Sequence, residues 1–320
     1  MRAVNRLFAL LLAFAASAAL AQEGKPLRFM VAFTPGGTAD TLARVIAQKL
    51  GELRGMQAIV ENRGGANGTI GLDAFRSWPP DGTGYSVISN SQVAAQLVAP
   101  GIKWDLARDF EQVMFLGDSP MVVAINPSRV NARTLQEALA AARAEPGRYA
   151  YGHCGPSSVH QLAMELIKMR AGVDIRQVAY RGCSPATTDA LSGQIDFLVA
   201  SSPAVLPHMR SGKLRGLAVT GAKRSAAAPD IPPAGEVLGM NDMAVDNWYA
   251  LVAVGGTPKD AVTRVEAAVR EVMARPEVLE RLAGAGIEVN LGGPEMVRKV
   301  IAEDLRNFKP IIERAGIRME

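Results

Sequence analysis

The chain has 320 residues, of which 48% are hydrophobic, and its 35 basic and 31 acidic side chains give a formal charge of +4. This apolar content excludes general disorder, and a small charge spread over a long chain with few aromatic residues excludes an extended nucleic-acid interface. A chain of this length is sufficient for two domains of ordinary size.

The first residues have the composition of a secretory signal peptide. Arg2 and Arg6 flank the start of an apolar run over residues 7–20, and Ala19-Leu20-Ala21 is an AxA-type cleavage site. The run is short and rich in alanine for a membrane span, and no cysteine follows the cleavage site to carry a lipid. We therefore predict a signal peptide over residues 1–21 and a soluble protein exported to the periplasm.

The first strand, turn and helix of the mature chain predict a site for an anion. An apolar run over residues 29–33 indicates a buried strand, and Pro35, Gly36 and Gly37 indicate the turn after it. Thr38 stands at the position of a helix N-cap, where free N–H groups and the helix dipole favour a negative charge. The candidate ligand-binding residues of this loop are Phe33, Thr34, Gly36, Gly37, Thr38 and Asp40. For Asp40, stabilisation of the first helical turn alone stays open as an alternative.

The next part of the chain adds a second polar strand end. A strand over residues 57–61 precedes a glycine-rich loop over residues 62–71, and a further strand is predicted over residues 85–88. In open α/β sheets, ligands bind at the carboxyl ends of the strands. The candidate contacts at this strand end are Ser89, Asn90 and Ser91.

The middle of the chain repeats the pattern of strand, turn and helix. Strands over residues 149–151, 175–180 and 195–200 each end in a polar turn. A helix is predicted after Ser158, which forms a capping box with Gln161, and another after Ser184 at the N-cap. The candidate ligand-binding residues of these turns are His153, Gly155, Ser157, Ser158, Arg181, Ser184, Ala186, Ser201 and Ser202. Helix capping by the serines, and a surface position for Arg181, stay open as alternatives.

Repeated alternation of strands and helices predicts an α/β fold with mostly parallel sheets. Apolar strands over residues 121–125 and 248–254 bracket the middle of the chain, and we interpret them as two hinge crossings. The chain then divides into a first lobe of residues 27–125 plus 248–320 and a second lobe of residues 126–247. Trp248 is expected at the hinge, in the wall of the site or in the core.

Cys154 and Cys183 are the two cysteines, and in an exported chain such a pair predicts a disulfide. Two unbonded buried thiols, and a metal site that adds His153 and His160, stay open as alternatives. No CxxC or HxxxH spacing supports a metal, so we expect neither a metal nor a cofactor. A further hypothesis is an exported cysteine hydrolase, in which Cys154 is the nucleophile and His160 the base, although His160 is expected on a helix surface.

Several short motifs occur in a fixed order: FTPGGTAD (33–40), ENRGGANGTIG (61–71), PPDG (79–82), INPS (125–128), YRGCSPA (180–186), GQID (193–196), LRGLAVT (214–220) and WYALVAVGGTP (248–258). With these motifs the chain resembles the periplasmic solute receptors of tripartite tricarboxylate transporters, the Bug-type receptors, from about residue 26 to the C-terminus. The chain departs from that family at Gly64, where proline is usual, at Asn67, which replaces a glycine, and at His153 and Cys154, which replace smaller residues.

The resemblance implies two α/β lobes of the type II periplasmic-binding-protein fold that close on a small ligand in the cleft between them. It implies a binding protein and not an enzyme, with an organic acid, amino acid or aromatic acid as the ligand. The partners would be the membrane subunits of a tripartite tricarboxylate-type transporter, while presentation of the ligand to a membrane sensor stays open. We expect main-chain N–H groups of both lobes to bind the carboxylate, and we expect a monomer.

Overall fold

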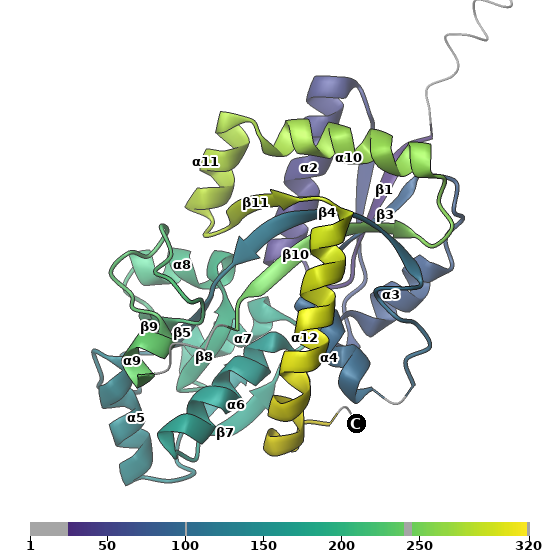
Figure 1. Cartoon of the computed structure of the whole chain (residues 1–320). Helices are drawn as coiled ribbons and strands as arrows, with labels where there is room; N and C mark the ends of the chain where they lie inside the picture. Colours follow the sequence, from purple (N-terminus) through teal and green to yellow (C-terminus); the bar gives the residue numbers. More distant parts are fainter. Residues whose placement is uncertain (1–24, 100, 240–244, 319–320) are drawn as a thin grey trace, which may run out of the picture.

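The computed structural model describes residues 25–99, 101–239 and 245–318, so the predicted signal peptide lies outside the described part of the chain. The strands form two sheets, each flanked by helices (Figure 1). The predicted α/β fold of two lobes with two crossings is therefore confirmed. Within the described ranges, no helix combines the length and the apolar character needed to cross a membrane.

The first sheet has the spatial order β11-β4-β10-β3-β1-β2. Its strands are β1 (Leu27–Val31), β2 (Ala58–Asn62), β3 (Gly84–Ser89), β4 (Phe110–Ser119), β10 (Asn247–Val254) and β11 (Glu288–Gly292). The helices around it are α2 (Thr38–Arg54), α3 (Thr69–Arg76), α4 (Asn90–Val98), α10 (Lys259–Met273), α11 (Pro276–Gly284) and α12 (Pro294–Ala315), with the short helix η1 (Ala66–Gly68). Apolar side chains of α2, α10 and α11 pack in one core cluster of this sheet, and those of α3 and the first half of α12 pack in another.

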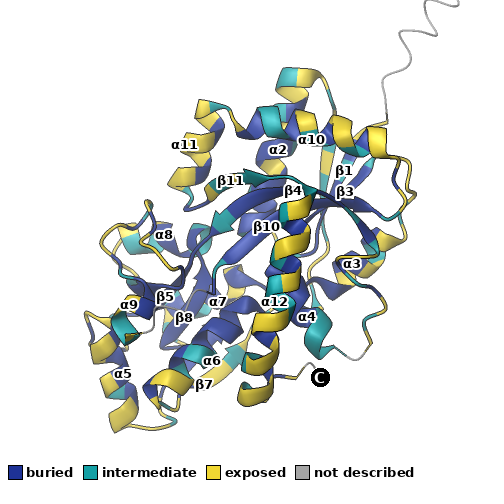
Figure 2. Cartoon of the chain, viewed as in Figure 1, coloured by how far each residue is buried: buried dark blue, intermediate teal, exposed yellow. Residues whose placement is uncertain are grey.

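The second sheet has the spatial order β7-β6-β8-β5-β9. Its strands are β5 (Met121–Ile125), β6 (Ala150–His153), β7 (Arg176–Ala179), β8 (Phe197–Ser201) and β9 (Arg215–Val219). Its helices are α5 (Leu135–Ala144), α6 (Val159–Ala171), α7 (Cys183–Ser192), α8 (Ser202–Arg210) and α9 (Ala234–Leu238). Figure 2 shows that the inner strands of both sheets are buried, while the edge strands β2, β7 and β11 and the outer faces of the helices are more exposed.

Helix α2 illustrates how the sequence determines the local structure. Its buried residues include Leu42, Val45, Ile46 and Leu50, which recur at the spacing that places side chains on one helix face. The helix ends at Gly55, which adopts the left-handed conformation with φ 62° that glycine tolerates best. This apolar face packs on β1 and β3 and so fixes the start of the helix at the end of β1.

Both sheets are mixed, so the prediction of mostly parallel sheets is wrong for three strands, β5, β10 and the edge strand β11, which runs antiparallel to β4. β5 runs antiparallel to β8 and β9, and β10 runs antiparallel to β3 and β4. β5 and β10 each follow an element of the other lobe and not a strand of their own sheet, since β5 follows β4 across Pro120 and β10 comes after β9 and α9. A strand that arrives in this way needs no helical crossover, and its direction is therefore not constrained to be parallel.

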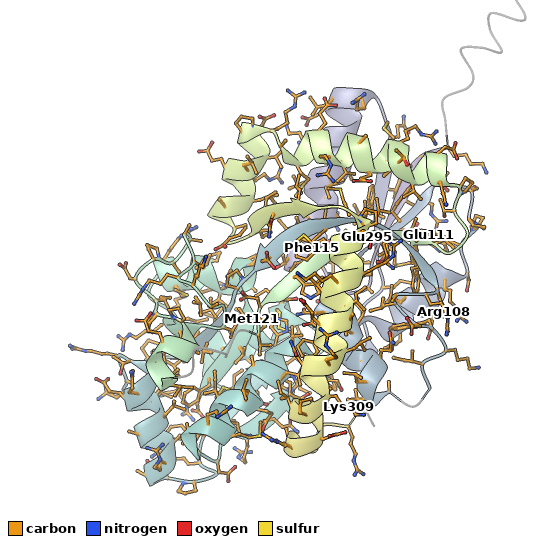
Figure 3. The ribbon with its side chains drawn as sticks, viewed as in Figure 1. Arg108, Glu111, Phe115, Met121, Glu295 and Lys309 are labelled. Carbon is orange, nitrogen blue, oxygen red and sulfur yellow. A yellow bond between two sulfur atoms is a disulfide. The ribbon has the colours of Figure 1, made fainter. Side chains whose placement is uncertain are left out.

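The chain passes from the first sheet to the second at Pro120, between the end of β4 and the start of β5. Phe115 on β4 and Met121 on β5 mark the two sides of this passage in Figure 3. The predicted boundary at residue 125 thus falls one strand too late, because β5 pairs within the second sheet. We keep the division into two lobes as a proposal, with the first lobe ending at Ser119.

Helix α12 contacts both lobes. Val297 and Ile301, in its first half, belong to the core of the first sheet, whereas Phe308 and Ile312 belong to a core of the second. Figure 3 shows Glu295 at the end beside the first sheet and Lys309 toward the end beside α6. Assignment of all of residues 248–320 to the first lobe therefore omits the contacts that the end of α12 makes with the second.

Three carboxyl groups lie near the passages between the sheets. Asp118 on β4 is the register partner of Glu288 on β11, and Asp246 immediately precedes β10. Burial raises the pKa of Asp246 to about 7, and the charges of Asp118 and Glu288 act in the same direction. Burial likewise raises the pKa of Asp118 to about 6.

The variant Asp246→Asn tests this arrangement. Because the folded-state pKa of Asp246 lies above the unfolded value, the folded protein binds more protons between about pH 4 and pH 7, and stability is lost as the pH rises through that range. The stability advantage of the neutral variant over the parent should therefore grow from pH 4 to pH 8, by at least the ~1.4 kcal/mol of one pKa unit. Urea unfolding at pH 4 and pH 8 measures the difference in free energy of unfolding between variant and parent, with the exposed Asp230→Asn as control. A difference that does not change with pH would contradict the prediction.

Candidate functional site

A cavity lies between the two lobes and is lined from both of them. Its lining residues are Phe33, Thr34, Gly37, Thr38, Ala39, Asn67, Ser89, Ser91, Cys154, Ser158, His160, Gly182, Cys183, Ser201, Asn247 and Tyr249. The volume open to the centres of water-sized molecules is ≈ 40 Å³, enough for about three waters. In the described part of the chain, no lysine, arginine, aspartate or glutamate lines this cavity.

Five helices start at this cavity. Helices α2 and α4 belong to the first lobe, and helices α6, α7 and α8 belong to the second. The lining residues at or next to these starts are Thr38, Ala39, Ser89, Ser91, Ser158, Cys183 and Ser201. Since every helix start carries a partial positive charge and N–H groups without intrahelical partners, the cavity favours an anion although its side chains are uncharged.

The start of α2 has donors that no side chain caps, as have the starts of α7 and α8. Its N-cap is Gly37, which has no side chain to cap the helix, and its first intrahelical hydrogen bond runs from the N–H of Thr41 to the carbonyl of Gly37. The N–H groups of Thr38 and Ala39 therefore have no helical partner. Thr38 is the first helical residue and not the N-cap that we predicted, because Gly37 already has the extended conformation of a cap.

Serine side chains cap two of the other helices. The hydroxyl of Ser89 accepts a hydrogen bond from the N–H of Ser91 at 3.3 Å, and that of Ser158 accepts one from the N–H of Gln161 at 3.4 Å. Ser89 also forms a capping box with Gln92. The same S-x-x-Q pattern that predicts α6 thus occurs at residues 89–92, where our sequence analysis placed only a polar strand end.

Asp40 stabilises the turn and does not line the cavity. Its carboxylate accepts hydrogen bonds from the Gly36 N–H at 3.0 Å, from Arg44 and from Asn62. Burial acts to raise the pKa of Asp40, but these hydrogen bonds outweigh it and lower the pKa below its ordinary value. The carboxylate therefore fixes the glycine turn that precedes α2.

The two lobes touch around the cavity. The N–H of Val159 on α6 donates to the hydroxyl of Ser91 on α4 at 3.4 Å, and the hydroxyl of Ser184 donates to the carbonyl of Pro35 at 3.2 Å. Gly182, with φ 126°, lies so close to Thr34 that a Cβ there would be 2.1 Å from the threonine hydroxyl oxygen. The structure therefore has a closed cleft.

Cys154 and Cys183 form a disulfide with a Cα–Cα distance of 4.4 Å, which confirms the predicted pairing. No unbonded cysteine occurs in the described chain, so the hypothesis of a cysteine nucleophile is wrong. Cys154, His160 and Cys183 bring possible metal-ligating atoms within 4.8 Å of one another, but the disulfide consumes both thiolates that a soft metal would need.

His160 is buried in the cavity wall and not on a helix surface, contrary to the prediction. Its Nε2 lies 3.1 Å from the hydroxyl of Ser201 and 3.6 Å from the Cys183 sulfur. Burial lowers the pKa of His160 to about 3, with His153 acting in the same direction. The imidazole is therefore neutral at physiological pH and adds no charge to the cavity.

The structure brings part of the predicted set together at the cavity. The predicted residues that line it are Phe33, Thr34, Gly37, Thr38, Ser89, Ser91, Ser158 and Ser201. The predicted residues that do not line it are Gly36, Asp40, Asn90, His153, Gly155, Ser157, Arg181, Ser184, Ala186 and Ser202. Contact between the ligand and either group of residues stays a prediction.

Most of the residues outside the cavity are held by other partners. The Asn90 side chain donates to the carbonyl of Asp246, and the Ser202 hydroxyl donates to the carbonyl of Pro120. The imidazole of His153 is buried, with its Nδ1 2.7 Å from the carbonyl of Gly155. The exposed Arg181 and the buried Gly155 line a neighbouring pocket.

The other predicted residues that do not line the cavity are explained by where the helices begin. Helix α7 starts at Cys183 after the cap Gly182, and not after Ser184, so Ser184 and Ala186 lie inside the helix. The N–H of Ser157 points to the side chain of Gln161, to which it donates at 2.6 Å.

Trp248 is buried, and its indole N–H donates to Asp304 at 2.7 Å, so it is a core residue.

Several lining residues were missed by the sequence analysis, namely Ala39, Asn67, Gly182, Asn247 and Tyr249. Asn247 and Tyr249 lie two residues apart on β10 and so share one face of the strand. The alternation of side chains along this strand could therefore have predicted from the sequence that both residues face the same side. Asn67 was noted only as a departure within the glycine-rich loop.

Comparison with known proteins gives consistent matches. The family profile "Tripartite tricarboxylate transporter family receptor" matches residues 42–317. Protein BugT of Bordetella pertussis is 30% identical over 99% of this chain and 99% of its own length. Two solved structures are similar over 93% of this chain: "Structure of a periplasmic transporter" (TM-score 0.88, 31% identity, all of that chain) and "R. palustris Rpa4515 with adipate" (TM-score 0.87, 27% identity, 99% of that chain).

Removal of the disulfide should destabilise the fold. The bonded residues are 29 positions apart, and a loop of this length gives roughly 3–4 kcal/mol in the chain-entropy model. The double variant Cys154→Ser/Cys183→Ser should lose most of that free energy of unfolding in urea. As a control, a dithiol reductant should destabilise the parent and leave the double variant unchanged; equal stability of parent and variant would contradict the prediction.

Proposed function

This chain belongs to the tripartite tricarboxylate transporter receptor family, and on that premise we propose that it captures a small carboxylate ligand between its lobes and delivers it to the membrane subunits of such a transporter. Proteins of this family, and the structural neighbours, are solute-binding proteins and not enzymes. The observation that carries the proposal is the convergence of five helix starts on one cavity without charged side chains.

Main-chain donors are sufficient to hold a carboxylate. A hydrogen bond from an N–H group to a charged acceptor contributes about 1.5–3 kcal/mol, and micromolar affinity needs about 8 kcal/mol. The N–H groups of Thr38 and Ala39, a few donors from the second lobe and the helix dipoles together reach that range. No buried counter-charge is needed.

Contacts from both lobes would couple binding to closure. A ligand held by α2 and α4 on one side and by α6, α7 and α8 on the other has its full set of contacts only in the closed form. Such a ligand shifts the population toward that form. The closed form is then the signal that a membrane partner recognises.

The chemical class of the ligand and the partner belong to this proposal. The adipate named for the R. palustris structure supports an organic acid. Export by the signal peptide over residues 1–21 and action as a monomer complete the proposal. A membrane sensor would use the same closure, so ligand binding is expected to be the same with either partner.

A thermal-shift screen of small acids on the ligand-free mature protein tests the ligand class. A ligand at about 100 times its Kd adds about 2.7 kcal/mol, which should raise the Tm by on the order of 5 °C. We expect at least one organic or amino acid to do so, while its methyl ester or amide does not. Stabilisation by a neutral compound and by no acid would contradict the proposal.

The role of the main-chain N–H can be tested at Thr38. Proline is favoured at the first helical position, and Gly37 has φ −85° and ψ 177°, an extended conformation that suits a residue before proline. Thr38→Pro should therefore fold, lose one N–H from the cavity and bind the acid found in the screen roughly tenfold or more weakly. Thr38→Val, which keeps the N–H and loses only the hydroxyl, should lose less than about threefold.

Calorimetric titration of both variants gives the comparison. Equal affinities of Thr38→Pro and Thr38→Val would show that this N–H does not bind the ligand.

A further inference from the structure

We propose that Asn67 accepts a hydrogen bond from the ligand, so that the ligand is a hydroxy acid and not an unsubstituted acid. This inference rests on the proposed function, because it takes for granted that a carboxylate occupies the cavity. It adds the identity of a second group on that ligand.

The orientation of the Asn67 amide is fixed by its neighbour. The Nδ2 of Asn67 donates to the carbonyl of Ser91 at 2.8 Å. A carbonyl can only accept, so the nitrogen must face Ser91 and the oxygen must be the other end of the amide. Asn67 has φ 50° and ψ 37°, a left-handed conformation that asparagine tolerates better than most residues.

The Oδ1 of Asn67 is buried and has no hydrogen-bond partner among the described residues. Asn67 is only 6% exposed and lines the cavity. Its Oδ1 faces the second lobe, because a Cβ placed on Gly155 would lie 3.7 Å from it. A buried amide oxygen without a partner is uncommon in folded proteins, and here it belongs to a residue that lines both the cavity and the neighbouring pocket between the lobes.

A second amide lies on the strand beside the start of α2. Asn247 is 1% exposed and lines the cavity, and its Nδ2 donates to the hydroxyl of Tyr249 at 2.7 Å. Its Oδ1 likewise has no partner in the described chain. Asn247 pairs in register with Ser119, whose hydroxyl accepts from that of Thr38 at 3.3 Å. The cavity therefore combines N–H donors at the helix starts with amide acceptors on its walls.

These acceptors discriminate between ligands by chemistry. An unsubstituted acid offers only acceptor oxygens and methylene groups, and it would leave the Asn67 oxygen without a partner. A hydroxyl group donates a hydrogen bond, and so does an ammonium group. Among the described residues, no carboxylate lines the cavity to balance an ammonium, and a buried charge without a partner is costly, so the neutral hydroxyl is the group that fits.

Matched pairs of acids test the inference by calorimetry on the mature protein: malate against succinate, lactate against propionate, and 3-hydroxybutyrate against butyrate, with aspartate and alanine as amino counterparts. In any pair that binds, the hydroxy acid should bind at least about tenfold more tightly, since a site built to bond a hydroxyl rejects the analogue that lacks it. Equal affinity within the pairs, or preference for the amino acid, would overturn the inference and leave the proposed function standing. Binding of no acid at all would overturn both.

The variant Asn67→Gly shows whether Asn67 is responsible. Glycine adopts the left-handed backbone of this position without strain, and the variant removes the amide. The affinity ratio of hydroxy acid to plain acid should fall to within about threefold of unity. Asn131→Gly, at an exposed position of the second lobe, is the matched control and should keep the parent ratio. An unchanged ratio in Asn67→Gly would contradict the assignment, and the ratio in the parent tests the proposal even if the glycine variant is unstable.

Discussion

The constraint on which this structure depends is that the first turn of a helix leaves N–H groups without partners. Five helices satisfy or expose these groups around one cavity, and the two lobes each contribute some of them. At α4 and α6 serine side chains take up part of this bonding capacity, whereas Gly37 leaves the start of α2 uncapped. The cavity is therefore polarised for an anion by the main chain alone, and the neutral His160 and the disulfide complete its wall.

The strands β5 and β10 make the two-sided cavity possible. Each follows an element of the other lobe and runs antiparallel to both neighbours in its sheet. Carboxyl groups with raised pKa values, Asp118 and Asp246, lie beside these passages. Helix α12 spans the same junction, because its two halves pack in the cores of different sheets. If the cleft opens, the two passages before β5 and β10 and helix α12 would have to change conformation or shift their packing.

Sequence patterns predicted the α/β class, the two passages, the disulfide and the loops around the cavity, because each has a local signal such as an apolar run, a glycine turn or a cysteine pair. The strand β4 was missed because Glu111 and Gln112 interrupt its apolar run, and α4 was missed although Ser89 and Gln92 form a capping box. Asn67 and His160 reach the cavity only through tertiary packing, which no local pattern encodes. Helix starts shifted by one or two residues moved Ser184 and Ala186 out of the cavity.

A crystal structure of the protein with a bound acid tests the central claim most directly. The account predicts carboxylate oxygens within about 3.2 Å of the main-chain nitrogens of Thr38 or Ala39 and of at least one donor at the start of α6, α7 or α8. A carboxylate paired instead with Arg181 or another charged side chain, with the N–H groups at the start of α2 bonded to water, would contradict it.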